Sequence, residues 1–210
     1  YAGTFTDGTA ALNLFKTGAG TLTLPGTSSS FTGGLSVTDG GLNLTGTLGA
    51  AGATATMGTG TTLSGEGIFG GSLTLSGATL NVDGSTSLSV LAAGNLNATG
   101  GVTVNLQSLP TTPGVIEVIG FGTSLTGNAG NFTLANASGY RTPVFSVAAN
   151  AVNLTLGAPV DLTWTGTGGS DWDIANTSNW NNPTLTASPF YFADNVTFGH
   201  VREGVEIEFD

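Results

Sequence analysis

The chain has 210 residues, a formal net charge of −10, and charges on only 8% of its residues. With 3 basic residues against 13 acidic ones, its composition argues against binding to nucleic acid or to an anionic membrane surface. No apolar run approaches the ~20 residues of a membrane-spanning helix, and the absence of cysteine excludes disulfides. Glycine is frequent, at 35 residues, yet regularly spaced Leu, Val, Ile and Phe argue against a disordered chain.

The residues from Lys16 to Gly46 contain three short runs in which apolar residues alternate with Thr, Ser or Asn. This period of two is typical of strands with one buried face. Glycine-rich corners separate the runs and permit backbone angles that other residues resist. The runs are Thr21–Leu24, Leu35–Thr38 and Leu42–Thr45, and the corners are Pro25-Gly26, Gly33-Gly34 and Asp39-Gly40-Gly41. Strand and corner in alternation predict one coil of a β-solenoid.

This stretch also resembles a known repeat. It contains, in order, KTGAGTLTLPG, FTGGLSV and GGLNLTG. The same order of parts characterises the passenger-associated repeat of bacterial autotransporters, the autotransporter-associated β-strand repeat. The resemblance covers roughly thirty residues and is weaker beyond them. It implies a β-helical passenger segment with a structural function outside the cell.

Two less regular regions flank the repeat. Before it, we expect lead-in strands at Thr4–Thr6 and Ala11–Phe15, with a turn at Asp7-Gly8. After it, residues 50–62 consist of small side chains with Met57 as the bulky apolar one, and they suit either a loose coil or a lateral loop. Helix is disfavoured there by glycine and threonine.

From Leu63 the alternating pattern returns. The apolar starts of successive strands lie roughly six to eight residues apart, so three strands make a coil of about 20 to 25 residues. Every third strand then stacks on the strand one coil earlier, and the inward Leu, Val and Ile side chains form columns. The expected strand cores are Leu73–Leu75, Leu80–Val82, Leu88–Val90, Leu96–Ala98 and Val102–Leu106.

A break at Pro110–Gly114 precedes a change of pattern. Val115–Ile119 predicts a better-buried strand with Glu117 pointing outward. Phe121, Leu125, Phe132 and Leu134 are interpreted as parts of an irregular excursion, and further strands are expected at Val144–Val147 and Ala151–Leu156. This order resembles the later part of autotransporter passenger units.

We therefore divide the chain into solenoid coils at residues 1–157 and a Trp-rich segment at residues 158–210. The Trp-rich segment resembles the start of a new unit in passengers that contain several units. Its resemblance lies in Trp164-Thr165-Gly166, Asp171-Trp172, Asn179-Trp180 and Asp194-Asn195-Val196-Thr197-Phe198. The order of parts predicts that the chain is one period, or a fragment, of a longer multi-unit protein.

The sequence offers few residues for catalysis or metal binding. His200 is the only histidine, it lies beside Arg202 and Glu203, and no G-x-S-x-G motif accompanies it, so we interpret it as a solvated loop residue. One histidine without cysteine does not predict zinc. Asp171 and Asp173, with Asp161 and Asp194, could present oxygen ligands to calcium, but no known calcium loop is present and a solvated turn is the preferred interpretation.

Polysaccharide-active enzymes can also be β-helical. Here the carboxylates along the predicted coils are isolated from one another in the sequence: Asp39, Glu66, Asp83 and Glu117. A lyase acting on acidic sugars also needs cationic groups, and the chain has only Lys16, Arg141 and Arg202, far apart in sequence. Fold analogy alone does not carry the activity.

Two further patterns have binding and structural interpretations. Trp164, Trp172 and Trp180 could form a sugar-stacking platform, but core packing is preferred because tryptophan buries a large area. Thr21 and Thr23 resemble the threonine pairs of ice-binding solenoids. Such a face needs threonine pairs in register on successive coils, and Asn43 and Asn81 break this regularity, so ice binding is a weak alternative.

The sequence thus predicts an all-β chain, a right-handed parallel β-helix, with no catalytic, cofactor or metal residues. The predicted function is a stiff, non-enzymatic segment of a bacterial extracellular or cell-surface fibre or autotransporter passenger. Its expected partners are copies or neighbouring units of itself, stacked end to end, without nucleic acid or membrane contact. The alternative is an adhesin that binds host or matrix glycans or protein through side loops at Gly122–Tyr140 or Asn181–Tyr191, and an enzyme comes third.

Overall fold

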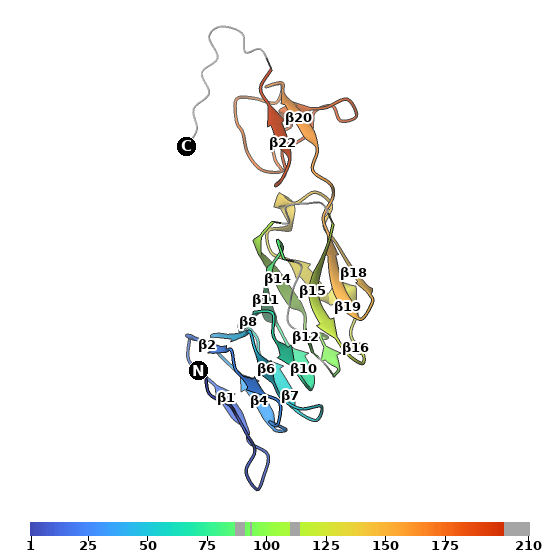
Figure 1. Ribbon diagram of the computed structural model, residues 1–210. Helices are drawn as coiled ribbons and strands as arrows, with labels where there is room; N and C mark the ends of the chain where they lie inside the picture. Colours follow the sequence, from blue (N-terminus) through green and yellow to red (C-terminus); the bar gives the residue numbers. More distant parts are fainter. Residues whose placement is uncertain (87–90, 93, 110–113, 200–210) are drawn as a thin grey trace. The chain divides into compact units, whose positions relative to one another are not determined.

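The computed structural model describes residues 1–86, 91–92, 94–109 and 114–199. These residues form many short β-strands (Figure 1) and two 3-10 turns, η1 (Ala129–Asn131) and η2 (Ala137–Gly139). They divide into two compact units. Unit 1 contains Tyr1–Ala135 and Pro143–Thr155, and unit 2 contains Asn136–Thr142 and the residues from Leu156 onward.

Three sheets build unit 1. Sheet A contains β1 (Leu14–Lys16), β4 (Gly34–Val37), β7 (Thr54–Met57), β10 (Ser72–Leu75), β13 (Leu96–Asn97) and β16 (Leu125–Thr126). Sheet B contains β2 (Thr21–Leu24), β5 (Gly41–Leu44), β8 (Thr62–Ser64), β11 (Ala78–Asp83), β14 (Val102–Ser108) and β17 (Phe132–Leu134). Sheet C contains β3 (Thr27–Ser28), β6 (Thr47–Leu48), β9 (Ile68–Phe69), β12 (Leu91–Ala92), β15 (Val115–Phe121), β19 (Ala151–Thr155) and β18 (Val144–Ala148).

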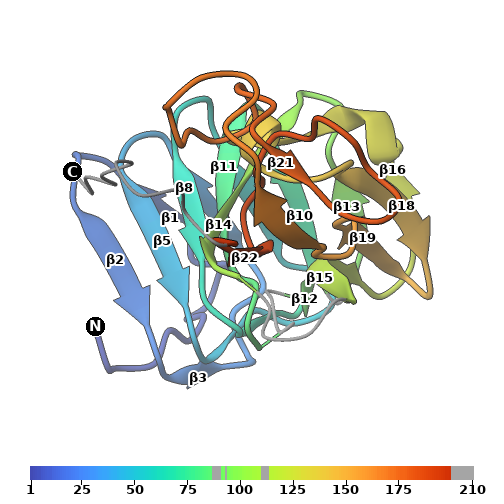
Figure 2. The ribbon, with the colours of Figure 1, turned by 90° about the horizontal axis from the view of Figure 1, so that it is seen from above.

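The order of strands within each sheet defines a solenoid. From β1 to β17, each strand pairs in parallel with the strand three elements later, so the chain visits sheets A, B and C in turn and then starts the next coil (Figures 1 and 2). Gly34 and Asn13, which hydrogen-bond between adjacent coils, are 21 residues apart. The predicted parallel β-helix is therefore confirmed.

The core consists of columns of inward side chains that stack from coil to coil. Because strand residues alternate between faces, every second residue joins a column, and the others point to solvent. The buried columns are Leu35, Ala55, Leu73 and Leu96 in sheet A, Leu42, Leu63, Leu80 and Val104 in sheet B, and Leu48, Phe69, Ala92 and Phe121 in sheet C. Burial of each large side chain stabilises the fold by about 1.5–3 kcal/mol. This stabilisation requires the neighbouring coils, because they cover the side chain.

Two regions are more regular than the sequence suggested. Residues 50–62 contain β7, which pairs in register with β4 and β10, and Met57 is fully buried in a second inward column of sheet A, between Val37 and Leu75. The interpretation of Leu125 and Phe132 as parts of an irregular excursion is wrong, because they belong to β16 and β17 of a further, longer coil. Long loops at the corners of a coil are tolerated because they lie on the surface. They separate the strands in the sequence, so the regular spacing of apolar residues is lost although the strands still stack.

At the start of the chain, Thr4–Thr6 is not a strand, and of the expected strand Ala11–Phe15 only Leu14 and Phe15 are in one, β1. These residues are held to the first coil by polar contacts instead. The Asp7 carboxylate accepts hydrogen bonds from the backbone N–H of Leu12 and from both the N–H and the hydroxyl of Thr32. The expected strand at Leu88–Val90 and the break at Pro110–Pro113 fall outside the described residues.

Sheet C ends differently from sheets A and B. Its last strands, β19 and β18, form an antiparallel hairpin that pairs with β15, whereas the sequence predicted parallel stacking. Ala149 and Asn150 in the two-residue turn have φ values of 52° and 59°, as a type I′ hairpin turn requires. The local turn therefore reverses the chain direction at this point of the solenoid.

Unit 2 has its own small sheet, in which β20 (Asp161–Trp164) pairs in parallel with β22 (Asn195–Thr197) and antiparallel with β21 (Trp180–Asn181). The Trp-rich segment is therefore not another solenoid coil. The spacing of about eight residues between its tryptophans also does not place them on three strands, since Trp172 lies outside any strand.

Glycines allow the backbones of adjacent coils to approach closely at the corner between sheets B and C. A Cβ atom on Gly46 would overlap the carbonyl oxygens of Gly26 and Pro25 in the preceding coil, and one on Gly67 would overlap the Gly46 oxygen. The same corner carries coil-to-coil bonds such as Ile68 N–H to the Gly46 oxygen, at 2.9 Å. Glycine is required here by contact rather than by backbone angle.

We predict that Gly46→Ala destabilises the solenoid by about 1–3 kcal/mol, because the added methyl group forces the two coils apart. The matched control is Gly52→Ala, since a Cβ there would meet no atom within 4 Å. Urea unfolding followed by far-UV circular dichroism measures both variants. Equal unfolding midpoints for the two variants would contradict the close-approach explanation.

Candidate functional site

Unit 2 brings all three tryptophans into one aromatic cluster. Trp180 lies at its centre and is fully buried. Its ring centroid is 4.9 Å from that of Trp164 and 5.4 Å from that of Trp172, both with edge-on geometry. Phe190 and Phe198 lie 6.0 and 5.7 Å from Trp180 and complete the cluster. Aromatic pairs favour such tilted and edge-on contacts, so the cluster forms the core of unit 2.

The members of this cluster differ in exposure. Trp180 is buried with no hydrogen-bond partner for its indole N–H, although Trp164 lies edge-on beside it. Trp172 is 40% exposed, and Ile174, two residues later, is 45% exposed. The core interpretation therefore holds for Trp180, while Trp172 remains the tryptophan that a ligand could reach.

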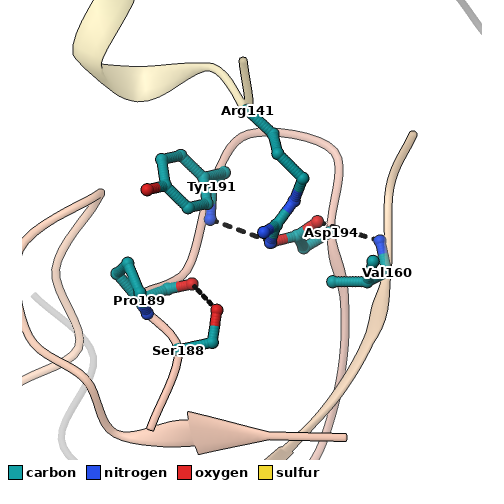
Figure 3. A network of polar contacts seen from close by, with 6 residues as sticks. All are labelled: Arg141, Val160, Ser188, Pro189, Tyr191 and Asp194. Atoms are coloured by element: carbon teal, nitrogen blue, oxygen red, sulfur yellow. Dashed lines mark hydrogen bonds and ion pairs between the residues drawn. The ribbon is translucent and has the colours of Figure 1, made fainter. Parts of the chain in front are cut away.

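A buried ion pair joins the two chain segments of unit 2. Arg141 Nη2 lies 2.7 Å from Asp194 Oδ2, and the Asp194 side chain is only 1% exposed. The same carboxylate accepts hydrogen bonds from the backbone N–H groups of Val160 and Tyr191, each at 3.0 Å (Figure 3). Since a buried carboxylate needs compensating donors, these three contacts together stabilise its charge.

Arg141 also packs against an aromatic ring. Its guanidinium carbon lies 4.6 Å from the centroid of the Tyr191 ring, within the range of a cation–π contact (Figure 3). Arg141 and Asp194 are 53 residues apart in sequence. No local sequence pattern links these two residues, so the sequence does not predict that they pair. The scarcity of basic residues in the chain was the one available hint.

The aspartates considered as calcium ligands have separate partners. Asp173 accepts bonds from the hydroxyl and N–H of Thr177 and from Asn176, Asp161 accepts one from the Asn195 amide, and Asp194 binds Arg141. In the described part of the chain, no three His, Cys, Asp or Glu residues come together as metal ligands would. The bonds from Thr177, the hydroxyl first, lower the pKa of Asp173 below its ordinary value.

Carboxylates along the solenoid also have local structural contacts. Asp39 accepts from the N–H of Gly40, Glu66 from the hydroxyl of Thr86, and Asp83 from Ser85 and Ser108. Glu117 lies opposite Asn153 in sheet C.

The described cations are engaged as well. The Lys16 ammonium donates to the backbone oxygens of Thr17, Gly18 and Asp39, and Arg141 belongs to the ion pair of unit 2. Lys16 lies in unit 1 and Arg141 in unit 2, so the described part of neither unit has the several cations that a groove for acidic sugars would need. His200, Arg202 and Glu203 lie outside the described residues.

Of the two segments expected as side loops, Gly122–Tyr140 differs from that expectation, whereas Asn181–Tyr191 is largely irregular. Gly122–Tyr140 contains β16, η1, β17 and η2, so much of it is part of the last coil and its end belongs to unit 2. Asn181–Tyr191 begins at the last residue of β21 and folds back so that Trp180 and Ser188 form an antiparallel bridge. Within it, the Asn182 side chain accepts bonds from the N–H groups of Thr184 and Leu185.

Comparisons with models of protein families, with curated proteins and with solved structures found no match to this chain. Among the described residues, no helix is long and apolar enough to cross a membrane.

We predict that Arg141→Met destabilises unit 2 by on the order of 3 kcal/mol, because it leaves the Asp194 charge buried without its partner. Thermal unfolding followed by tryptophan emission reports on unit 2 alone, since all three tryptophans lie there. Lys16→Met, which removes a cation from unit 1, serves as the control and is expected to leave this transition unchanged. Equal transitions for wild type and Arg141→Met would show that the ion pair does not hold unit 2 together.

A second prediction concerns acid. Because the folded-state pKa of Asp173 is lowered, its contribution to stability is present above the ordinary aspartate pKa of about 3.9. That contribution is lost as the pH falls through the lower folded-state value. The tryptophan-monitored melting temperature of Asp173→Asn is therefore expected to fall less than that of wild type between about pH 5 and pH 2.

Asp171→Asn is the control for this experiment, because the Asp171 carboxylate makes none of the bonds to Thr177 or Asn176. It is expected to follow the wild-type pH dependence. A wild-type pH dependence in Asp173→Asn would mean that other groups account for the acid sensitivity of unit 2.

Proposed function

We propose that this chain is a non-enzymatic structural segment of a bacterial extracellular or cell-surface fibre of the autotransporter passenger type, in which stacked coils supply a stiff stalk. The observation that supports the proposal best is the parallel, in-register pairing of coils through β1 to β17. A stacked solenoid resists bending because any bend must separate buried side chains from the next coil.

The energetics of stacking suit this role. In a solenoid, stability is approximately the sum of terms for each repeat and for each interface with its neighbours. Adding coils therefore lengthens the structure without requiring a larger central core. A surface stalk needs this property because its reach must increase with chain length.

The composition is also consistent with export. The chain contains no cysteine, so no thiol can form an incorrect disulfide in an oxidising compartment. Each coil can fold on the one before it, because most contacts lie between adjacent coils. Folding that proceeds coil by coil requires neither cofactor nor metal.

Association with further copies or units is part of the proposal. Among the described strands, β1 pairs with β4 alone and so presents a second edge with backbone donors and acceptors, whereas at β2 the Tyr1 ammonium already donates to the Thr23 oxygen. An unpaired edge can accept a strand from another molecule or another unit. In sheet C, β18 is an edge strand and is preceded by Pro143. Proline has no N–H to donate, which limits pairing with another strand at the start of this edge.

The adhesin alternative has one observation in its favour. Trp172 exposes 40% of its surface although it packs edge-on against Trp180 and Phe190, and an exposed indole can stack on a sugar. The enzyme alternative has less support, because the carboxylates of the solenoid bond to serine, threonine or backbone groups rather than facing one another.

Immunogold electron microscopy of the organism that makes the chain tests the proposal. Antibodies raised against the 210-residue chain are expected to label thin fibres outside intact cells. Pre-immune serum is the control for non-specific labelling. Gold that appears only after the cells are lysed, or only on the cytoplasmic side of the envelope, would overturn the proposed location and function.

A further inference from the structure

The outermost strand of sheet C, β18, is the longest described edge strand of unit 1. It contains five residues, whereas the other described edge strands, β1, β2, β3, β16 and β17, contain between two and four. β18 pairs with β19 on one side only and lies at the margin of the sheet (Figure 2). Its second side therefore offers a row of backbone groups to another strand.

Most of the other edges carry a feature that disfavours strand pairing. β1 carries Lys16, and a charged side chain on an edge strand makes pairing less favourable. At β2, the Tyr1 ammonium occupies the Thr23 oxygen. β3 and β16 have only two residues each, which is too short for an extended ladder of bonds.

β18 and the residues around it in the sequence carry no charge. The chain has no charged residue between Arg141 and Asp161, although its net charge is −10. Val144 and Val147 of β18 are 57% and 43% exposed. A second copy can therefore approach this edge without bringing carboxylates together, and it can cover valine side chains that water now contacts.

The hairpin turn determines which backbone groups of β18 point away from β19. Two residues connect the strands, so Ala148 and Ala151 form a hydrogen-bonded pair, and bonded and non-bonded pairs then alternate. The N–H and C=O groups of Phe145 and Val147 consequently point to the open side. Among the described residues, neither of these two has a backbone bond to a segment outside sheet C.

These open groups match those of a second copy that is turned by a two-fold rotation. With the axis at Ser146, Phe145 stands opposite Val147 of the second copy, and the reverse pair forms by symmetry. Each of these pairs exchanges both of its N–H to O bonds. A shift of the register by two residues loses bonds, because it places Pro143, which has no N–H, or the turn residue Ala149 in the ladder.

The side chains in this register are also complementary. Phe145 and Val147 lie in rows with the buried Leu154 and Val152 of β19, on the inward face of the sheet. In the pair, the Phe145 ring of one copy covers Val147 of the other, and aromatic and β-branched residues are favourable neighbours across strands. On the outer face, the two Ser146 hydroxyls meet at the axis and can bond to each other.

Repulsion between the two copies is small at this edge. The outer row of sheet C that ends at Ser146 continues through Asn153 to Glu117. Across the axis, the two Glu117 side chains would be five strand spacings apart, or roughly 24 Å. This distance is well beyond the Debye length of about 8 Å at physiological ionic strength.

We propose that β18 pairs antiparallel with β18 of a second copy, so that two molecules form a closed dimer in which sheet C is continuous. Such a dimer is a specific form of the association with further copies in the proposed function, on which it rests. Because both copies use the same edge, the assembly ends at two molecules. Association through two different edges would instead continue to longer assemblies.

Sedimentation velocity of the purified 210-residue chain over a wide range of concentration tests the dimer. Wild type is expected to pass from monomer to dimer and no further. Ser146→Glu places two carboxylates opposite each other at the axis and is expected to weaken dimerisation at least about tenfold. The matched control is Thr103→Glu, at an exposed position of β14 in sheet B. It adds the same charge and is expected to dimerise like wild type.

Cysteine substitution tests the register, since the chain has no cysteine of its own. The two Ser146 residues form a non-hydrogen-bonded pair with Cα atoms about 4.5 Å apart, within the range that a disulfide spans. Under mild oxidation, Ser146→Cys is expected to form covalent dimers several-fold faster than Thr103→Cys. Circular dichroism checks the fold of each variant, and the cysteine pair decides the question if Ser146→Glu does not fold.

A wild type that stays monomeric at all concentrations would overturn the proposal. Equal dimerisation of the two glutamate variants, or equal cross-linking of the two cysteine variants, would do the same. Assemblies that grow beyond the dimer and are unchanged in Ser146→Glu would also overturn it, because they would show association through other edges. The extracellular location and the stalk are tested separately by the immunogold experiment, so the two failures are distinguishable.

Discussion

Stacking of inward leucine, valine and phenylalanine side chains between adjacent coils is the interaction on which unit 1 depends. A single coil has too little interior to bury these side chains, so each column is shielded only when the coil on either side is in register. Parallel pairing fixes that register, because a shift of one residue would turn the whole column toward solvent. Close backbone approach at the Gly46 corner is a consequence of the same constraint, since the coils can pack at strand distance only where the corner lacks a Cβ atom.

Unit 2 is stabilised by a different kind of interaction. It has few strand residues, and its core is an aromatic cluster centred on the buried Trp180. Arg141 reaches this unit from a segment that lies between solenoid strands in the sequence, and its contacts with Asp194 and Tyr191 attach that segment to the rest of the unit. A chain in which charge is scarce thus uses one of its three basic residues for a buried contact.

The same alternation that builds the core also determines the surface. Each strand that buries two apolar side chains presents its intervening polar residues outward, and parallel registration aligns these into columns. Unit 1 therefore shows regular polar faces whose chemistry depends on which residues share a column. In sheet A one outward column runs from Ser36 through Thr56 and Thr74 to Asn97, and in sheet B one runs from Thr62 through Thr79 to Thr103.

The sequence by itself determined the all-β class, the solenoid plan and the coil length, because alternation of apolar residues and glycine corners are local signals that repeat. It did not determine the antiparallel hairpin of β18 and β19, the coil membership of Leu125 and Phe132, or the sheet of unit 2, since these depend on which distant strands pair. The contact of Arg141 with Asp194 and the alignment of Thr62, Thr79 and Thr103 were likewise decided only by tertiary structure. Residues far apart in sequence become neighbours through the winding of the chain, and local composition does not specify which of them will meet.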